Sequence, residues 1–333
     1  MNTSCEKASS IINRRSFLKL SFVVAAAAVA ARFAIESTDF SQLCGSEKRN
    51  LNRNALIIAG GNTIRSNFPS FFIDAVLWHD TLQRTLAIPP ENITLLYFDG
   101  RTPPAGDLYN YIQTDKEAAE LDCFLDHFPL QETVINGSTN KSNVIHHLAN
   151  STNSTTPRDQ TLIIHAGHGF MKNSKVDDGI HSVMLLPEDE SLFDYEFAGA
   201  IKGNNSREII TFLNQCYATS FLQAPAIVPN LAVFTADGDN GLGEFASLDR
   251  RQGIQWPWPA AIRQGLTEPR QNDLNMNGKI NLAELQKCIL TNDQMATQGV
   301  FHLRSQEFRK THPGFTYGQN LNPDQLNILQ YSH

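Results

Sequence analysis

Short apolar runs alternate with helical patterns along the middle of the chain. The run NALIIAGG, residues 54–61, is short, apolar and closed by glycines, which predicts a buried strand. A helix is expected over residues 68–86, where apolar positions recur at helical spacing, and ITLLYF predicts a second strand after PPEN breaks the pattern. Three further strands are predicted by TLIIHA, EIITFLN and LAVFTA, with a helix over residues 193–201. The alternation predicts an α/β fold with a mostly parallel sheet covered by helices.

The segment between the second and third predicted strands is different in character. Residues 99–156 are rich in Pro, Gly, Asn, Ser and Thr, and only SNVIHHLAN, residues 142–150, has a short helical pattern. We expect an insertion made mainly of surface loops there.

Two residues with catalytic chemistry follow neighbouring predicted strands. His168 comes after TLIIHAG, and Cys216 comes directly after EIITFLN. Because the carboxyl ends of parallel strands meet at one edge of the sheet, where such folds bind ligands, we expect the two side chains to lie there together. A cysteine needs a nearby base to become a thiolate at neutral pH, and His168 can be that base. Gly169 leaves a backbone N–H free to face an oxyanion.

These residues lie within motifs that are similar to a known family. AGGN after the first strand, HGF at His168, LLPEDE after it and QCYATSF at Cys216 resemble the legumain-like branch of the caspase superfamily, over residues 54–244. The resemblance implies a caspase-like three-layer sandwich around a mostly parallel sheet, and peptide cleavage by a Cys and His dyad. It implies that His168 is base and acid, Cys216 the nucleophile, Gly169 an oxyanion donor and Asn62 an orienting group near the histidine.

The turn after the fifth predicted strand carries acidic residues. Asp237 and Asp239 follow LAVFTA and should lie at the same sheet edge as the dyad. Carboxylates beside the residue before the scissile bond would favour Arg or Lys there, with Asn as the second choice. The alternative is a solvated Asp-Gly turn, which is favoured on backbone grounds alone.

A second motif lies near the C-terminus. The segment DLNMNGKINLAE has the spacing of a twelve-residue EF-hand loop, with a glycine at Gly278 for its sharp turn and a helical pattern after it. Calcium is therefore the expected cofactor, although an Asn-rich polar turn is the alternative. The expected ligands are oxygen atoms of Asp273, Asn275, Asn277, Lys279 through its carbonyl, Asn281 and Glu284.

The N-terminus has the layout of an export signal. Arg14 and Arg15 precede Phe17 and Leu18, as in a twin-arginine motif, and a moderately apolar, alanine-rich run follows. This run is shorter than the roughly 20 residues that span a bilayer, so we expect export to the periplasm, cell envelope or exterior, with a retained anchor as the alternative. Contact with a membrane is expected only through this signal. The expected organisation is a signal over 1–35, a linker over 36–52, a catalytic domain over 53–265 and an extension over 266–333.

Composition narrows the partners and leaves three functional readings. The 333 residues carry a net charge of −7, which gives no broad cationic surface for a phosphate backbone, so nucleic acid is not an expected partner. The sequence predicts no particular oligomeric state. A peptide or protein substrate and an exported cysteine endopeptidase are the main expectation. The alternatives are a catalytically silent, calcium-dependent envelope binding protein and a thiol acyltransferase or transpeptidase on the same fold.

Overall fold

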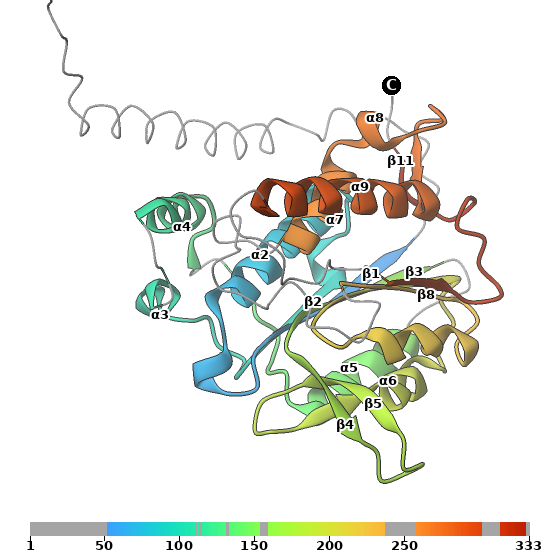
Figure 1. The fold of residues 1–333 in the computed structure, drawn as a ribbon, viewed down its shortest axis with the longest axis horizontal. Helices are drawn as coiled ribbons and strands as arrows, with labels where there is room; N and C mark the ends of the chain where they lie inside the picture. Colours follow the sequence, from blue (N-terminus) through green and yellow to red (C-terminus); the bar gives the residue numbers. More distant parts are fainter. Residues whose placement is uncertain are drawn as a thin grey trace, which may run out of the picture.

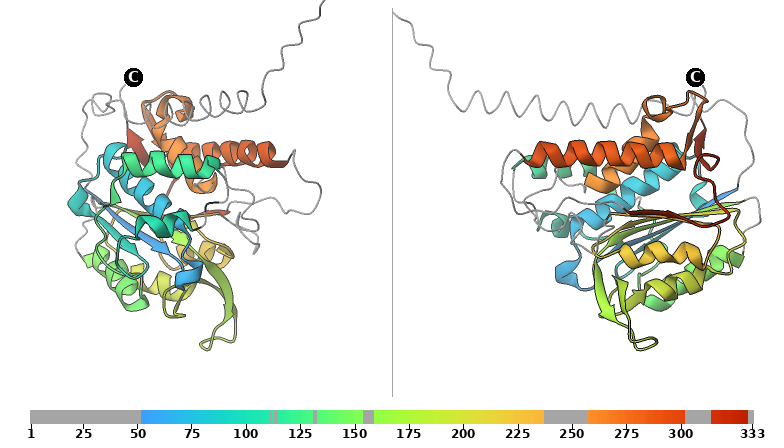
Figure 2. Two further views of the ribbon diagram at one scale, coloured as in Figure 1. Left: turned by 90° about the vertical axis from the view of Figure 1, so that its left-hand side faces the viewer. Right: turned by 45° about the vertical axis from the view of Figure 1, so that its right-hand side comes forward.

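A six-stranded sheet forms the centre of the protein, and helices cover both of its faces (Figure 1; Figure 2). The computed structural model describes residues 52–330 except 111, 113–114, 131–132, 154–158, 237–256 and 302–313. The elements, in chain order, are β1 (Arg53–Gly60), η2 (Ile64–Ser66), α2 (Pro69–Arg84), η3 (Pro90–Asn92), β2 (Ile93–Tyr97), α3 (Ala105–Tyr109), α4 (Asp115–His127), α5 (Lys141–Asn153), β3 (Gln160–Gly167), β4 (Gly169–Asn173), β5 (Ile180–Leu185), β6 (Ser191–Phe193), α6 (Asp194–Ile201), β7 (Glu208–Asn214), η5 (Thr219–Ala226), β8 (Leu231–Thr235), α7 (Pro257–Thr267), α8 (Pro269–Asn272), β9 (Lys279–Asn281), α9 (Leu282–Phe301), β10 (Gly314–Tyr317) and β11 (Asn327–Gln330).

The strand order of the central sheet is β10-β8-β7-β3-β1-β2, and only β10 runs antiparallel to its neighbour. Ile57 lies beside Ile164, which lies beside Phe212, which lies beside Phe234. The parallel strands therefore end together, and the turns that follow β1, β3 and β7 meet at one edge. We call this the carboxyl edge of the sheet. The predicted three-layer α/β sandwich around a mostly parallel sheet is confirmed.

Both faces of the sheet are apolar, as a sheet covered by helices on two sides requires. Ile57 packs into the core under α2, α7 and α9, whereas Leu56 and Ile58 pack into the core on the α5 and α6 side, and all three are nearly inaccessible to solvent. Figure 2 shows these two helical layers on opposite sides of the strands.

Helix α2 begins at the carboxyl edge of the sheet, and side-chain contacts fix its position. Pro69 stands at its start, where the missing N–H costs no hydrogen bond. Trp78 stacks on Phe212 of β7 with ring centroids 5.5 Å apart. Asp74 and Arg263 form a buried ion pair at 3.4 Å that joins α2 to α7.

The C-terminal region shares the same sheet and helical layer. The domain boundary expected at residue 265 falls within α7, and β10 returns to pair with β8, with Gly314 opposite Thr235. Helices α7 and α9 pack closely. A Cβ atom at Gly265 would lie 2.9 Å from Leu285 and 3.1 Å from the Cys288 sulfur, which is closer than van der Waals contact.

Residues 99–156 contain more helix than expected. The short patch at 142–150 is helical, as α5, but the expectation of loops is wrong for α3 and α4. In α4, Leu121 and Phe124 are fully buried, three positions apart, so burial of one helical face stabilises a segment whose mean character is polar.

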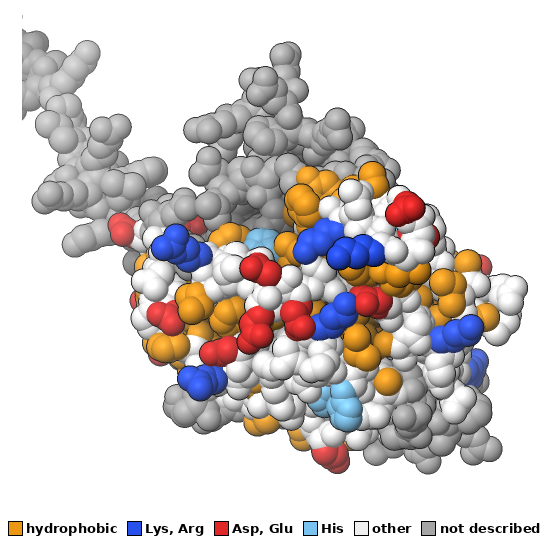
Figure 3. Space-filling model, turned by 90° about the horizontal axis from the view of Figure 1, so that it is seen from below, with side chains coloured by type: hydrophobic (Ala, Val, Ile, Leu, Met, Phe, Trp, Pro, Cys, Tyr) orange, Lys and Arg blue, Asp and Glu red, His pale blue; other side chains and the backbone are white. Residues whose placement is uncertain are grey.

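The export signal and the linker lie outside the described residues. None of the described helices combines the length and the apolar character that crossing a bilayer requires. On the face seen from below in Figure 1, acidic and basic side chains are interspersed (Figure 3).

Candidate active site

His168 lies immediately after β3, and its ring is held by the turn after β1. The Nε2 atom of His168 is 2.9 Å from the backbone carbonyl oxygen of Ser66. A carbonyl oxygen can only accept, so Nε2 carries the proton and donates it. The neutral ring then has its lone pair on Nδ1, which is the nitrogen that can take a proton from a thiol.

Two phenylalanines at the start of α2 enclose the histidine. The rings of Phe68 and Phe71 each meet the imidazole edge-on, with centroids 5.1 Å away. Burial lowers the pKa of His168, and the hydrogen bond to Ser66 opposes part of that effect. The ring is therefore neutral at physiological pH, as a general base must be.

Ser66 is itself fixed by local hydrogen bonds. Its Oγ accepts from the backbone N–H of Thr63 at 3.0 Å, and Thr63 Oγ1 accepts from the backbone N–H of Ser66 at 3.2 Å, which together form a capping box. A side chain at Gly61 would collide with the Ser66 carbonyl group, so only glycine permits this approach. Asn62 Oδ1 accepts from Ser66 Oγ at 2.8 Å. Asn62 is therefore connected to His168 indirectly, because the Ser66 carbonyl is the group that accepts from His168.

Cys216 lies in a sharp turn after β7 and is 6% exposed. The next residue, Tyr217, has a φ of +52°, a left-handed conformation that costs energy for a residue with a side chain. The preceding residue, Gln215, is fully buried and donates from Nε2 to the Val183 carbonyl oxygen at 3.2 Å. The turn is therefore anchored to β5, the strand that pairs with the segment after His168.

Gly169 joins the histidine turn to the cysteine turn. A side chain there would collide with the Cys216 carbonyl oxygen and would come within 2.6 Å of Gln215 Nε2. The residue after His168 therefore packs directly against the backbone of Cys216. The structure thus brings His168, Gly169 and Cys216 together at the carboxyl edge of the sheet.

The pairing of β4 with β5 decides which way the Gly169 N–H points. The His168 carbonyl accepts from Leu185 N–H at 2.9 Å, and Ser174 N–H donates to the Gly179 carbonyl at 2.8 Å, so even-numbered residues of this segment bond to β5. In an antiparallel pair the residues between them point their N–H and C=O groups to the other side. The Gly169 N–H therefore points away from β5, as an oxyanion donor must.

Other sequence expectations fare differently. Asp237 and Asp239 lie outside the described residues, so their place in a specificity pocket stays a prediction. Sequence reasoning missed Ser66, because it acts through a backbone carbonyl, which every residue has. The Thr63 and Ser66 capping pattern was the available signal for a fixed turn there.

The loop from Asp273 to Glu284 is closed by its own carboxylates. Asp273 accepts from the N–H groups of Asn277 and Gly278, at 3.1 and 2.7 Å. Glu284 Oε1 accepts from the N–H of Leu274 at 3.0 Å, and also from that of Asn275 at 3.2 Å. Gly278 has a φ of +77°, which explains the glycine at the turn.

Asn281 and Glu284 form a reciprocal cap at the start of α9. Glu284 Oε2 accepts from Asn281 N–H at 3.1 Å, and Asn281 Oδ1 accepts from Glu284 N–H at 2.9 Å. Ile280 is fully buried and pairs with Leu329 of β11, which fixes the loop to the last described strand.

The residues of this loop fit a calcium ion by their chemistry. Asp273 and Glu284 are 4% and 6% exposed, and both carboxylates face the inside of the loop. The other side chains expected as ligands also carry oxygen atoms, and oxygen is the donor type that calcium prefers. Within the described residues no three His, Cys, Asp or Glu side chains form a metal-binding group. The expected set at this loop has only two acidic members, the others being amide and carbonyl oxygens.

Comparisons with known proteins give a fold-level likeness only. No protein-family model matches the sequence, and neither does any curated protein. Among solved structures, a structural-genomics protein from Geobacter sulfurreducens matches over 84% of this chain and 97% of its own, with a TM-score of 0.48 and 10% sequence identity. A likeness this distant assigns neither a family nor an activity.

Proposed function

We propose that this protein is a cysteine endopeptidase that cleaves peptide or protein substrates with Cys216 as nucleophile and His168 as general base. The observation that carries the proposal is the His168 Nε2 hydrogen bond to the Ser66 carbonyl, because it leaves Nδ1 as the basic nitrogen beside the Cys216 turn. A buried cysteine alone is ordinarily a small apolar residue. Cys216 differs from such a residue because a fixed, neutral imidazole lies at the same edge of the sheet.

The chemistry follows from these groups. His168 Nδ1 takes the thiol proton, the thiolate attacks the substrate carbonyl, and the negative oxygen is stabilised by the Gly169 N–H. The protonated His168 then gives the proton to the leaving amine. The thioester that remains on Cys216 is hydrolysed by water, which restores the thiol.

Two variants test the dyad. Cys216→Ala and His168→Ala should each reduce peptide hydrolysis by several orders of magnitude, since the two groups act as a unit. Circular dichroism shows whether each variant is folded. Near-normal turnover by either folded variant would falsify the dyad.

A thioester intermediate also permits transfer to an amine instead of water, which is the acyltransferase alternative. Product analysis by mass spectrometry, with and without a peptide amine acceptor, separates the two. Hydrolysis products that persist with acceptor present support the peptidase. A silent binding protein would give no product and no reaction of Cys216 with a thiol-directed electrophile.

We further propose that the loop from Asp273 to Glu284 binds one calcium ion through the oxygen atoms of Asp273, Asn275, Asn277, Lys279, Asn281 and Glu284. Its support is the inward arrangement of the two buried carboxylates. The ion would neutralise both charges and join the two ends of the loop. Calorimetric titration with calcium alone should show one site, and absence of binding heat across the millimolar range would contradict it.

The proposed export rests on the sequence of the N-terminal segment. Replacing Arg14 and Arg15 by Lys should leave unprocessed protein in the cytoplasm, because the paired arginines are the part of the signal that the transport receptor reads. Cell fractionation measures this. Normal delivery of the double variant to the envelope would favour a general secretory signal instead.

A further inference from the structure

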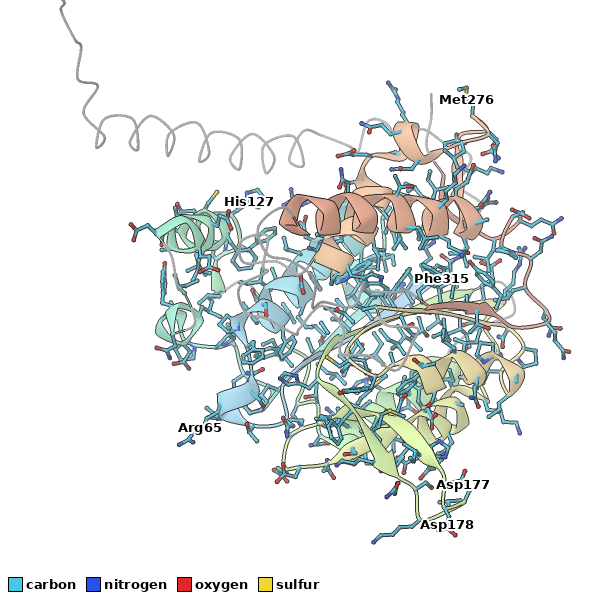
Figure 4. All side chains as sticks on the ribbon, viewed as in Figure 1. Arg65, His127, Asp177, Asp178, Met276 and Phe315 are labelled. Atoms are coloured by element: carbon cyan, nitrogen blue, oxygen red, sulfur yellow. The ribbon has the colours of Figure 1, made fainter. Side chains whose placement is uncertain are left out.

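The strand that follows His168 is an edge strand. The small antiparallel sheet has the order β4-β5-β6 in the described part of the chain, so β5 pairs with both neighbours and β4 with only one. Figure 1 shows the hairpin of β4 and β5 extending from the body, and Figure 4 shows Asp177 and Asp178 at its tip. An edge strand presents a row of backbone donors and acceptors that another extended chain can use.

The register shows which groups make up this row. Even-numbered residues of the segment bond to β5, so the N–H and C=O groups of Gly169, Met171 and Asn173 point to the outer side. The pairing with β5 therefore does not use the N–H and C=O groups of these three residues. The row begins at the same Gly169 N–H that faces the proposed oxyanion.

The proposed chemistry fixes which half of a substrate lies along this edge. His168 must reach the amine that leaves, because it returns the proton to that nitrogen. The residues after the scissile bond therefore begin on the His168 side of Cys216, where β4 also begins. A chain that continues from that nitrogen along β4 runs in the same direction as the strand.

We infer that the part of a peptide substrate that follows the scissile bond binds as an added strand, parallel to the outer edge of β4. The inference rests on the proposed peptidase function and deepens it. In parallel pairing, one residue of β4 donates to one residue of its neighbour and accepts from the residue two positions later. With the carbonyl before the scissile bond on Gly169 N–H, the Gly169 carbonyl accepts from the second residue after that bond. The Met171 N–H donates to the carbonyl of that same second residue.

The side chains at the start of the edge suit an extended peptide. Phe170 is 51% exposed, and its ring meets Tyr217 edge-on at 5.8 Å, next to Cys216. A half-exposed aromatic pair offers apolar contact without a charge requirement. Strand addition of this kind takes its affinity from main-chain hydrogen bonds, so it accepts varied sequences.

The first test changes the substrate backbone. Peptides that are N-methylated at the second residue after the scissile bond lose the N–H that pairs with Gly169, whereas methylation at the third residue alters a group that points away. The second-residue peptide should have a kcat/KM about three- to tenfold lower than the parent, the worth of one hydrogen bond, and the third-residue peptide should stay close to the parent. Equal losses at both positions, or a loss only at positions before the scissile bond, overturn the inference.

The second test changes the enzyme backbone. Met171→Pro removes an outward N–H without removing a bond to β5, since proline is tolerated on edge strands at such positions. The ratio of kcat/KM for a peptide with four residues after the scissile bond to that for an aminocoumarin amide, which has none, should fall about three- to tenfold. Met171→Ala, which keeps the N–H, should preserve the wild-type ratio, and an equal fall in both variants overturns the inference.

The two proposals fail differently. If the coumarin amide is cleaved and the ratio is insensitive to Met171→Pro, the peptidase stands and the added strand is wrong. If neither substrate is cleaved by the wild-type protein, the peptidase proposal fails and the inference fails with it.

Discussion

His168 is held by groups from distant parts of the chain, whereas Asp273 and Glu284 are held by the backbone of their own loop. The Ser66 carbonyl comes from the turn after β1 and Phe71 from α2, and Gly169 packs against the turn after β7. In the loop from Asp273 to Glu284, the N–H groups that donate to the two carboxylates come from within ten residues. The first region should therefore be sensitive to small displacements of its packing, and the second mainly to loss of a ligand.

The largest effect should come from filling the contact between the turns that carry His168 and Cys216. In Gly169→Ala the new methyl group would collide with the Cys216 carbonyl, so the turns must separate. A misplacement of about 1 Å can cost on the order of a hundredfold in rate, and we expect a fall in kcat/KM of that size. Peptide hydrolysis measures it.

The chain contains a matched control for this substitution. A side chain at Gly199, in α6, would meet nothing within 4 Å. Gly199→Ala should leave kcat/KM unchanged and stabilise the helix by about 0.5–1 kcal/mol, because alanine is the better helix former. If both variants keep wild-type turnover, close contact at Gly169 is unimportant for the reaction.

The same contrast explains what the sequence could predict. Strand periodicity located β1, β2, β3, β7 and β8, and their parallel order placed His168 and Cys216 at one edge. The loop at Asp273 could be predicted as a turn that precedes a helix because its polar residues and Gly278 follow one another at fixed spacing. The hydrogen bond that His168 donates to the Ser66 carbonyl could not be predicted, because the two residues are 102 positions apart and meet only through the folded position of η2.

Elements stabilised mainly by tertiary contacts also could not be predicted from the sequence pattern. The α4 segment has polar residues on most positions, and only the burial of Leu121 and Phe124 against the rest of the core makes it a helix. The hairpin of β4 and β5 has no strong alternation, because Val183 and Met184 are consecutive and both buried. Propensity alone cannot report such contacts.

Calcium binding by the loop from Asp273 to Glu284, as proposed, should depend on the ligand side chains and not on neighbouring ones. Glu284→Gln removes the charge of the closing ligand and should abolish the calorimetric signal. At calcium concentrations one hundred times the dissociation constant, the wild-type protein should gain about 2.7 kcal/mol of stability, and the variant none. Thermal unfolding with calcium or with chelator measures the difference.

Lys279 provides the control for this loop. It would contribute only its backbone carbonyl, so Lys279→Ala should keep calcium binding. Equal binding by wild type, Glu284→Gln and Lys279→Ala would show that the carboxylate is not a ligand. The loop would then serve only to cap α9.

A smaller effect is expected at the start of β5, next to the turn that joins it to β4. His181 Nδ1 lies 2.8 Å from Asp194, and its Nε2 lies 2.9 Å from Asp177. Burial disfavours the charged ring, but the hydrogen bonds and charges of Asp194 and Asp177 outweigh it and raise the pKa of His181 above 6.5. The pairing of protonated His181 with the two carboxylates therefore gives its full contribution to stability below pH 6.5. This contribution is lost as the pH rises through the raised pKa of His181.

Urea unfolding of wild type and His181→Gln tests this dependence. The wild-type advantage should be present at acidic pH and should shrink at alkaline pH. An advantage that grows with pH would have the wrong sign. In either case the Gly169 contact, at the other end of β4, should dominate the effect on turnover.

The most direct test of the dyad is the reactivity of Cys216 compared with that of Cys288. Both are buried thiols, but burial raises the pKa of Cys288 to about 11, whereas the Cys216 backbone packs against Gly169, the residue after His168. Peptide mapping by mass spectrometry after timed treatment with iodoacetamide measures both rates in one sample. We predict that Cys216 reacts faster than Cys288, because His168 can take the Cys216 proton whereas burial keeps the Cys288 thiol protonated, and that His168→Gln removes most of the difference. Equal rates in the wild-type protein, or a Cys216 rate that His168→Gln does not change, would contradict the account.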